Sequence, residues 1–94
     1  MKNVHVYNME SSNGNKVPNQ FIIETPQGTY FQSYSTIIAR RFWDMDGNKR
    51  IQLDENAWDY SVTTGRYRNQ FLRENKPETE YKISTGEYEL VDLN

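Results

Sequence analysis

Residues 58–72 read Trp-Asp-Tyr-Ser-Val-Thr-Thr-Gly-Arg-Tyr-Arg-Asn-Gln-Phe-Leu, and no other segment of the chain combines a long aromatic-rich helical pattern with clustered cations. On a helix, Tyr67 and Phe71 lie one turn apart on one face, while Arg66 and Arg73 share the opposite face. We therefore predict that Tyr67 and Phe71 anchor the hydrophobic core and that these two arginines face solvent.

The same helix cannot extend back to Trp58 and keep its apolar residues on one face. Its continuation would place Trp58 on the Arg66 side, and residues 62–65 are mediocre or poor helix formers. The sequence predicts instead a short helix near residues 55–60 and a longer one near residues 64–74, with Ser61 or Thr63 as the N-cap of the longer helix.

The size and composition of the chain indicate one small domain. Its 94 residues are 35% hydrophobic and 14% aromatic, so we expect a core built from a few large rings. The absence of cysteine excludes disulfides and thiolate metal sites. No N-terminal apolar run resembles a signal peptide or a membrane span, and we therefore expect a cytoplasmic protein.

Strand patterns occupy most of the rest of the chain. They fall at residues 4–7, 20–25, 30–31, 36–43, 50–53 and 87–92, with turn signals at Pro26-Gln27-Gly28 and Asp46-Gly47-Asn48 and a further short helix over residues 77–85. We predict a single α+β domain over residues 1–94, an antiparallel β-meander of three to five strands with two or three short helices on one face and a C-terminal strand. Residues 1–18 are expected to form a partly flexible N-terminal strand and loop. The predicted core comprises Phe21, Ile23, Phe31, Ile38, Leu53, Trp58, Tyr67, Phe71 and Leu90.

The loop Asp44–Glu55 resembles an EF-hand calcium loop. It carries acids or amides at loop positions 1, 3 and 5, an isoleucine at position 8 and a glutamate at position 12. Position 6 is Lys49, however, where a sharp turn requires glycine. The alternative is a hairpin turn at Asp46-Gly47, and this is the interpretation that we prefer, with no metal bound.

Two groups of cations could bind nucleic acid. Ser61, Thr63 and Thr64 beside Arg66 and Arg68 suit a phosphate at a helix N-terminus, although the hydroxyls could simply cap the helix and Arg68 could extend over the core. Arg40-Arg41 and Lys49-Arg50 lie on neighbouring predicted strands close to Trp43, but consecutive residues of a strand point to opposite faces. The residues of this nucleic-acid hypothesis are Arg40, Lys49, Arg50, Arg66 and Arg73.

The formal net charge of −2 lacks the basic excess that usually accompanies sequence-independent nucleic-acid binding. Acids gather near the C-terminus, where Glu74, Glu78, Glu80, Glu87, Glu89 and Asp92 face only Lys76 and Lys82. Such a run is commonly a solvated acidic face.

Catalysis is not expected. The chain has no Ser/His/Asp arrangement and no cysteine, and its single histidine, His5, lies in a predicted strand. Nothing in the sequence predicts that Asp54 or Asp59 is buried as a catalytic acid or base would be. We therefore predict a protein that is no enzyme and carries no cofactor.

Three blocks of the sequence resemble a group of small proteins encoded by bacteriophages and prophages of Gram-positive bacteria. The blocks are Tyr34-Ser35-Thr36-x-Ile38-Ala39, Ile51-x-Leu53 and Trp58-Asp59-Tyr60-Ser61-x-Thr63-Thr64-x-x-Tyr67-Arg68-x-x-Phe71-Leu72. The resemblance implies an accessory protein, a class that includes anti-CRISPR and other inhibitors of bacterial defence.

Together with the acidic C-terminal region, this resemblance leads to our first functional hypothesis. The protein would bind a host defence protein, such as a nucleic-acid-guided nuclease complex, in the cytoplasm of an infected bacterium. Its acids would occupy a basic nucleic-acid channel by charge mimicry. The residues predicted for that surface are Glu78, Glu80, Glu87 and Glu89.

Overall fold

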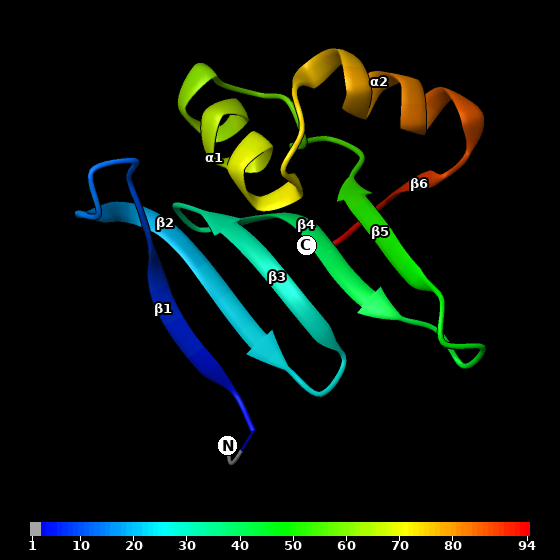
Figure 1. Cartoon of the computed structure of the whole chain (residues 1–94), viewed down its shortest axis with the longest axis horizontal. Coiled ribbons are helices and arrows are strands. Elements are labelled where there is room, and N and C mark those ends of the chain that lie inside the picture. Colours follow the sequence, from blue (N-terminus) through cyan, green and yellow to red (C-terminus); the bar gives the residue numbers. More distant parts are fainter. Residues whose placement is uncertain (1–2) are drawn as a thin grey trace.

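The computed structural model describes residues 3–94, so Met1 and Lys2 of the expected flexible segment lie outside it. The chain forms one six-stranded sheet in the order β1-β2-β3-β4-β5-β6. The elements are β1 (His5–Glu10), β2 (Lys16–Thr25), β3 (Gly28–Ser33), β4 (Thr36–Trp43), β5 (Lys49–Asp54), α1 (Val62–Leu72), α2 (Lys76–Thr85) and β6 (Tyr88–Val91). Both helices lie over one end of one face of the sheet, and they leave the end where β4 finishes bare (Figure 1). Within the described chain, neither helix has the length and apolar character needed to cross a membrane.

The α+β class and the helices on one face agree with the sequence prediction, but the sheet is larger and only partly antiparallel. Strands β1 to β5 form an antiparallel meander, whereas β6 runs parallel to β5. A parallel neighbour requires a crossover connection, and here α1 and α2 together form that crossover. A pattern of single strands does not reveal this, because the direction of β6 depends on how the helices return the chain.

The predicted helix at residues 55–60 is wrong. The segment forms consecutive turns organised by Asp54, whose backbone oxygen accepts the N–H groups of Ala57 at 3.3 Å and Trp58 at 3.1 Å. The buried Asp54 carboxylate also accepts the N–H of Asn56 at 3.1 Å. The longer helix is present, but it spans Val62–Leu72 rather than residues 64–74, so residues 62–65 are helical despite their poor propensity. Ser61, one of the two predicted N-cap residues, caps it through its hydroxyl.

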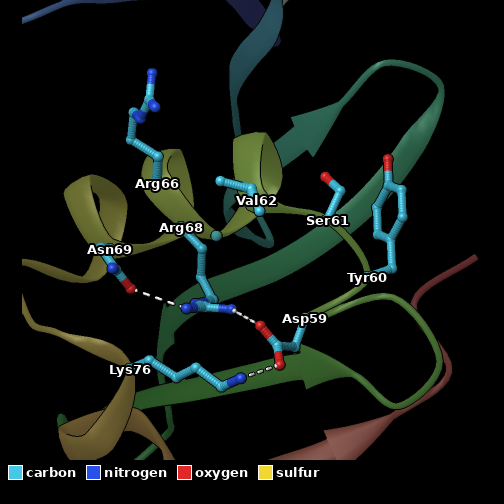
Figure 2. Close-up of a pocket in the computed structure, with 9 residues that line it drawn as sticks. Asp59, Tyr60, Ser61, Val62, Arg66, Arg68, Asn69 and Lys76 are labelled. Atoms are coloured by element: carbon cyan, nitrogen blue, oxygen red, sulfur yellow. Dashed lines mark hydrogen bonds and ion pairs between the residues drawn. The ribbon is translucent and has the colours of Figure 1, made fainter.

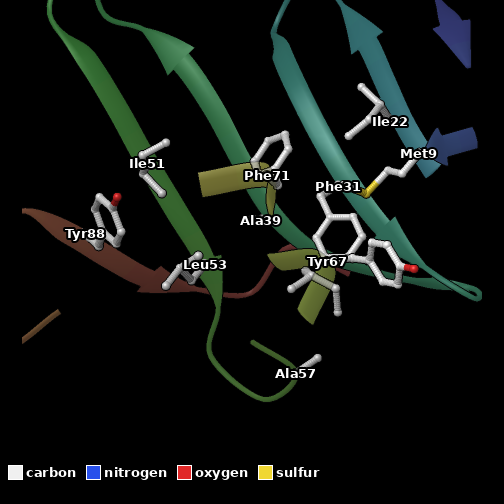
Figure 3. Close-up of a cluster of buried hydrophobic side chains, with 11 residues drawn as sticks. Met9, Ile22, Phe31, Ala39, Ile51, Leu53, Ala57, Tyr67, Phe71 and Tyr88 are labelled. Carbon is white, nitrogen blue, oxygen red and sulfur yellow. The ribbon is translucent and has the colours of Figure 1, made fainter. Parts of the chain in front are cut away.

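The hydrophobic core lies between the sheet and α1. The predicted core residues Phe31, Ile38, Leu53, Tyr67 and Phe71 are buried, and the Phe31 and Phe71 ring centroids are 6.0 Å apart. Figure 3 shows the α1 rings packed among side chains from the strands. The core prediction is therefore confirmed for both rings of α1.

The prediction is wrong for β2, where Ile22 rather than Phe21 and Ile23 faces the helices. Successive side chains of a strand point to opposite faces. Choosing the wrong inward-facing residue therefore assigns every side chain of the strand to the wrong face. Phe21 and Ile23 are half-buried on the opposite face of the sheet.

Two more predicted core residues lie near its boundary. Trp58 is only partly buried, and Leu90 is 39% exposed because β6 is an edge strand with a neighbour on one side only. In that strand Tyr88 is buried instead, and its hydroxyl donates to Glu74 Oε1 at 2.8 Å. Burial and this hydrogen bond raise the pKa of Tyr88 to about 12.

Candidate functional site

Strand β4 ends with Phe42, which lies against Gly28 of β3, and Trp43, which lies beyond β3 at the bare end of the sheet. The last paired residues of these strands are Thr29 and Arg41, after which Phe42 and Trp43 pair only with β5. Alternation along the strand places Arg41 and Trp43 on the helix side and Arg40 and Phe42 on the other side. The end of β4 thus presents a cation and an aromatic ring on each face.

On the helix side, these residues help to form a cavity of about 410 Å³, which we call the β4-end pocket. Strands β1, β2, β4 and β5 and the C-terminal end of α1 all contribute to it. Its lining residues are Tyr7, Met9, Ile22, Arg41, Trp43, Lys49, Gln70, Phe71 and Arg73.

The β4-end pocket is basic. Arg41, Lys49 and Arg73 line it, and none of its described lining residues is acidic. Within residues 3–94, none of these three cations takes part in an ion pair. The pocket therefore presents positive charge that no carboxylate neutralises by direct contact.

Arg41 is held in place against the end of α1. Its Nη1 donates to the backbone oxygen of Phe71 at 3.3 Å, and its guanidinium carbon lies 4.5 Å from the centre of the Phe71 ring. A cation at a helix C-terminus is stabilised by the free carbonyl groups there. One hydrogen bond and the contact with the Phe71 ring thus orient Arg41, and the other N–H donors of its guanidinium remain for a ligand.

Two aromatic rings border the same pocket and face solvent. Trp43 is 62% exposed and Tyr7 is 48% exposed, so both rings are accessible to a ligand in the pocket. The Tyr7 hydroxyl donates to Glu24 Oε2 at 3.2 Å, which restricts the ring. Burial and this hydrogen bond raise the pKa of Tyr7 above its ordinary value.

The other sequence-predicted cations lie elsewhere. Arg40 is on the opposite face of the sheet, stacked 3.9 Å above the Phe42 ring, and Arg50 forms an exposed ion pair with Asp44 at 3.6 Å. Arg66 lies on the solvent side of α1. Of the five cations predicted to bind nucleic acid, the structure brings only Lys49 and Arg73 into one pocket, where Arg41 lies with them.

The predicted phosphate cradle at the start of α1 is already occupied by the chain itself (Figure 2). A cavity of about 600 Å³ lies here, but the Asp59 carboxylate bridges Arg68 at 3.0 Å and Lys76 at 2.6 Å. The Ser61 hydroxyl accepts the Thr64 N–H at 3.1 Å and thereby caps the helix. We call Asp59, Arg68 and Lys76 the Asp59 cluster.

Arg68 is the most deeply buried charge of this cluster, with only 1% of its side chain exposed. It also donates to the Trp58 backbone oxygen at 2.8 Å and to Asn69 Oδ1 at 3.0 Å. Burial alone would raise the pKa of Asp59, but the hydrogen bonds and charges of Lys76 and Arg68 outweigh burial and lower it. The cluster therefore joins the turn before α1, α1 itself and the start of α2.

The four acids predicted to bind a partner do not form one surface. Glu78 and Glu80 lie on α2, where the Glu78 carboxylate accepts the Asn75 N–H at 3.2 Å as part of a capping box. Glu89 accepts a hydrogen bond from Gln52 at 2.9 Å on the sheet face opposite the helices. Glu87 lies in the turn between α2 and β6.

The segment Asp44–Glu55 forms the predicted hairpin. Asp44 Oδ1 accepts the N–H groups of Asp46 and Asn48, both at 2.9 Å. The six residues of β5 separate Asp44 from Glu55 by about 20 Å. Across residues 3–94, no three His, Cys, Asp or Glu side chains gather as metal ligands.

Sequence reasoning missed Tyr7 as a candidate site residue. Its β1 position is far from Trp43 along the chain, and only the order of the strands and the end of α1 make both border one pocket. Arg41 had a usable signal, because strand alternation pairs it with Trp43.

Comparison with known proteins places the chain in a family but does not assign an activity. No curated protein and no solved structure matches it significantly. One family model matches residues 4–87, a span that includes the β4-end pocket and the Asp59 cluster. The chain therefore belongs to the family of unknown function DUF8033.

Proposed function

We propose that this protein binds single-stranded nucleic acid, without catalysis, through the β4-end pocket. The observation that carries the proposal is the lining of one cavity. Three cations and two exposed aromatic rings line it, and none of the three cations forms an ion pair among the described residues. Single-stranded nucleic acid offers the matching chemistry, since it carries phosphates beside bases with free flat faces.

The roles of the side chains follow from their chemistry. A base would stack on Trp43 or Tyr7, because every base has a π-face that an aromatic ring can cover. Arg41, Lys49 and Arg73 would contact the adjoining phosphates, with the arginines able to donate two parallel hydrogen bonds. A duplex fits less well, because its bases are already stacked on one another.

The overall charge of −2 is compatible with this proposal because no described acid lines the pocket, although Glu24 accepts a hydrogen bond from Tyr7 beside it. Glu78 and Glu80, for example, lie on α2, outside the lining of the pocket. Three phosphate contacts with a single strand predict that log Kd rises with log salt concentration with a slope of about 2.

Fluorescence anisotropy with a labelled oligothymidylate tests the proposal. We expect saturable binding at low salt and a loss of about 5- to 100-fold in affinity on Trp43→Ala, the effect of losing one base stack. Tyr81→Ala is the matched control, because Tyr81 is 68% exposed on α2, away from the pocket. Absence of binding at low salt, or equal losses for the two variants, would refute the proposal.

A second candidate, binding to a host protein, is favoured by the same exposed Tyr81. It lies on α2 close to Glu78 and Glu80, and an exposed tyrosine is a frequent centre of protein interfaces. The resemblance to phage accessory proteins suggests a bacterial defence complex with a basic channel as the partner. Tyr81→Ala should then abolish capture of a stoichiometric protein from a host lysate, whereas Trp43→Ala should not.

A further inference from the structure

A second cavity adjoins the β4-end pocket. Its volume is about 380 Å³, and it lies between the β2–β3 turn and the last residues of β4. Arg41 and Trp43 line both cavities, so the two meet at the end of β4. The remaining lining residues of the second cavity are Thr25, Pro26, Gln27, Gly28, Thr29, Arg40 and Phe42.

The second cavity contains a fixed guanidinium plane. Arg40 Nε and Nη2 donate to the Gln27 backbone oxygen at 3.0 and 2.6 Å, and Nη1 donates to Gln52 Oε1 at 3.0 Å. Its central carbon lies 3.9 Å from the Phe42 ring centre and 5.9 Å from that of Tyr30. Hydrogen bonds thus hold the edges of the plane, and Phe42 supports one of its faces.

Such a plane is a platform for a nucleic-acid base. Bases stack on arginine guanidinium planes as they do on aromatic rings, and a platform that is already ordered loses little entropy on binding. Among the described residues that line this cavity, none is acidic, as in the β4-end pocket. Both cavities therefore offer a stacking surface together with positive charge.

We propose that a single strand passes around the end of β4, with one base on Trp43 and the next on Arg40. This inference rests on the proposed function and specifies its ligand as an oligonucleotide of two or more units, rather than a free nucleotide. Arg41, which lines both cavities, would contact the phosphate between the two bases. The path is possible because Gly28, the first residue of β3, has no side chain where it lies against Phe42, and β3 has no residue beyond it to lie beside Trp43.

The test compares thymidine monophosphate, a phosphorylated dinucleotide and a hexanucleotide by calorimetric titration at low salt. We expect the dinucleotide to bind about 5- to 100-fold more tightly than the mononucleotide, as a second base stack requires. This comparison uses the unmodified protein and does not depend on the folding of a variant. Equal affinities for the two would overturn the inference while leaving the proposed function intact. Failure of all three ligands to bind would overturn both.

Arg40→Lys sharpens the test, because it keeps the charge but removes the plane. We expect it to reduce the ratio of dinucleotide to mononucleotide affinity towards one, while Tyr81→Ala keeps the ratio of the unmodified protein. A ratio that is unchanged in Arg40→Lys would show that the second base does not stack on Arg40, and would overturn the inference.

Discussion

Arg41 and Arg68 make nearly the same contacts in two regions of the molecule, yet only one has a carboxylate partner. Arg41 donates to the Phe71 backbone oxygen at 3.3 Å and lies over the Phe71 ring. Arg68 donates to the Trp58 backbone oxygen at 2.8 Å and lies over the Trp58 ring. Asp59 pairs with Arg68 at 3.0 Å, although the buried Nε of Arg68 has no hydrogen-bond partner within residues 3–94, whereas no described carboxylate pairs with Arg41.

The presence or absence of a carboxylate partner distinguishes the two arginines: Arg68 stabilises the fold, and we propose that Arg41 binds a ligand. A buried charge is tolerated when hydrogen bonds and an opposite charge replace the water that it has lost. The Asp59 cluster provides an opposite charge and hydrogen bonds for Arg68, and the single Asp59 carboxylate is shared with Lys76. At the β4-end pocket no described carboxylate pairs with Arg41, and this is why we propose that a phosphate binds there.

The largest expected effect is on the stability of the Arg68→Ala variant. We expect the free energy of unfolding to fall by about 3 kcal/mol, because the change breaks an ion pair to a buried charge and leaves the Trp58 oxygen without its donor. The 31% exposure of Asp59 keeps the loss at the lower end of the range for buried pairs. Urea denaturation measures it, and a loss below about 0.5 kcal/mol would show that the cluster does not hold the fold.

Arg41→Ala should show the reverse pattern. We expect about 10-fold weaker binding of an oligothymidylate, the value of one charge-assisted phosphate contact, with a stability loss of about 1 kcal/mol or less. Anisotropy and urea denaturation on the same preparation give both numbers. If Arg41→Ala were as destabilising as Arg68→Ala and bound normally, the functional distinction between the two arginines would be wrong.

The Asp59 cluster also predicts how stability depends on pH. The pKa of Asp59 is lower in the folded protein than its ordinary value of 3.8. Its contribution is therefore complete above about pH 4 and is lost as the pH falls through the lower folded value. Lys76 is the larger cause of the lowered pKa and Arg68 the smaller, so we expect Arg68→Ala to flatten the acid limb of the stability profile in part, measured by urea denaturation from neutral to acid pH. An identical slope in both proteins would contradict this role of Asp59.

The smallest expected effect concerns Glu24, which holds the Tyr7 hydroxyl beside the β4-end pocket. Removing its charge by Glu24→Gln should increase oligonucleotide affinity by about two- to threefold at low salt, with a smaller gain at high salt because of screening. A control is Glu80→Gln on α2, which should change the affinity less. Weaker binding of Glu24→Gln would mean that orienting Tyr7 matters more than the nearby charge.

Local patterns in the sequence were sufficient for much of the fold. Alternation and turn residues identified the hairpin at residues 44–48, and the hydroxyls before the helical pattern narrowed the N-cap to Ser61 or Thr63, of which Ser61 is the cap. The inward face of β2 depends on contacts with a distant segment, α1, and was predicted wrongly. Ile22 lies between two other large apolar residues, so alternation could not decide which of them face α1.

The candidate site was predictable only in part, for the same reason. Trp43 and the cations of β4 and β5 are visible as a cluster along the chain, and alternation assigns Arg41 to the Trp43 face. Tyr7 and Arg73 join them through the sheet order and the left-handed turn at φ 59° that ends α1. The burial of Arg68 against Asp59 likewise arises from the turns at residues 55–60, which the sequence had suggested were helical.

The two tryptophans test the central claim within a single sample, because Trp43 borders the β4-end pocket and Trp58 contacts Arg68. Their indole N–H groups give two separate signals in a nitrogen–proton correlation spectrum, which Trp43→Ala assigns. On titration with an oligothymidylate at low salt, we predict that the Trp43 signal shifts saturably while the Trp58 signal remains in place. A shift of Trp58 alone, or no shift of Trp43 at saturating ligand, would contradict the assignment of nucleic-acid binding to the β4-end pocket.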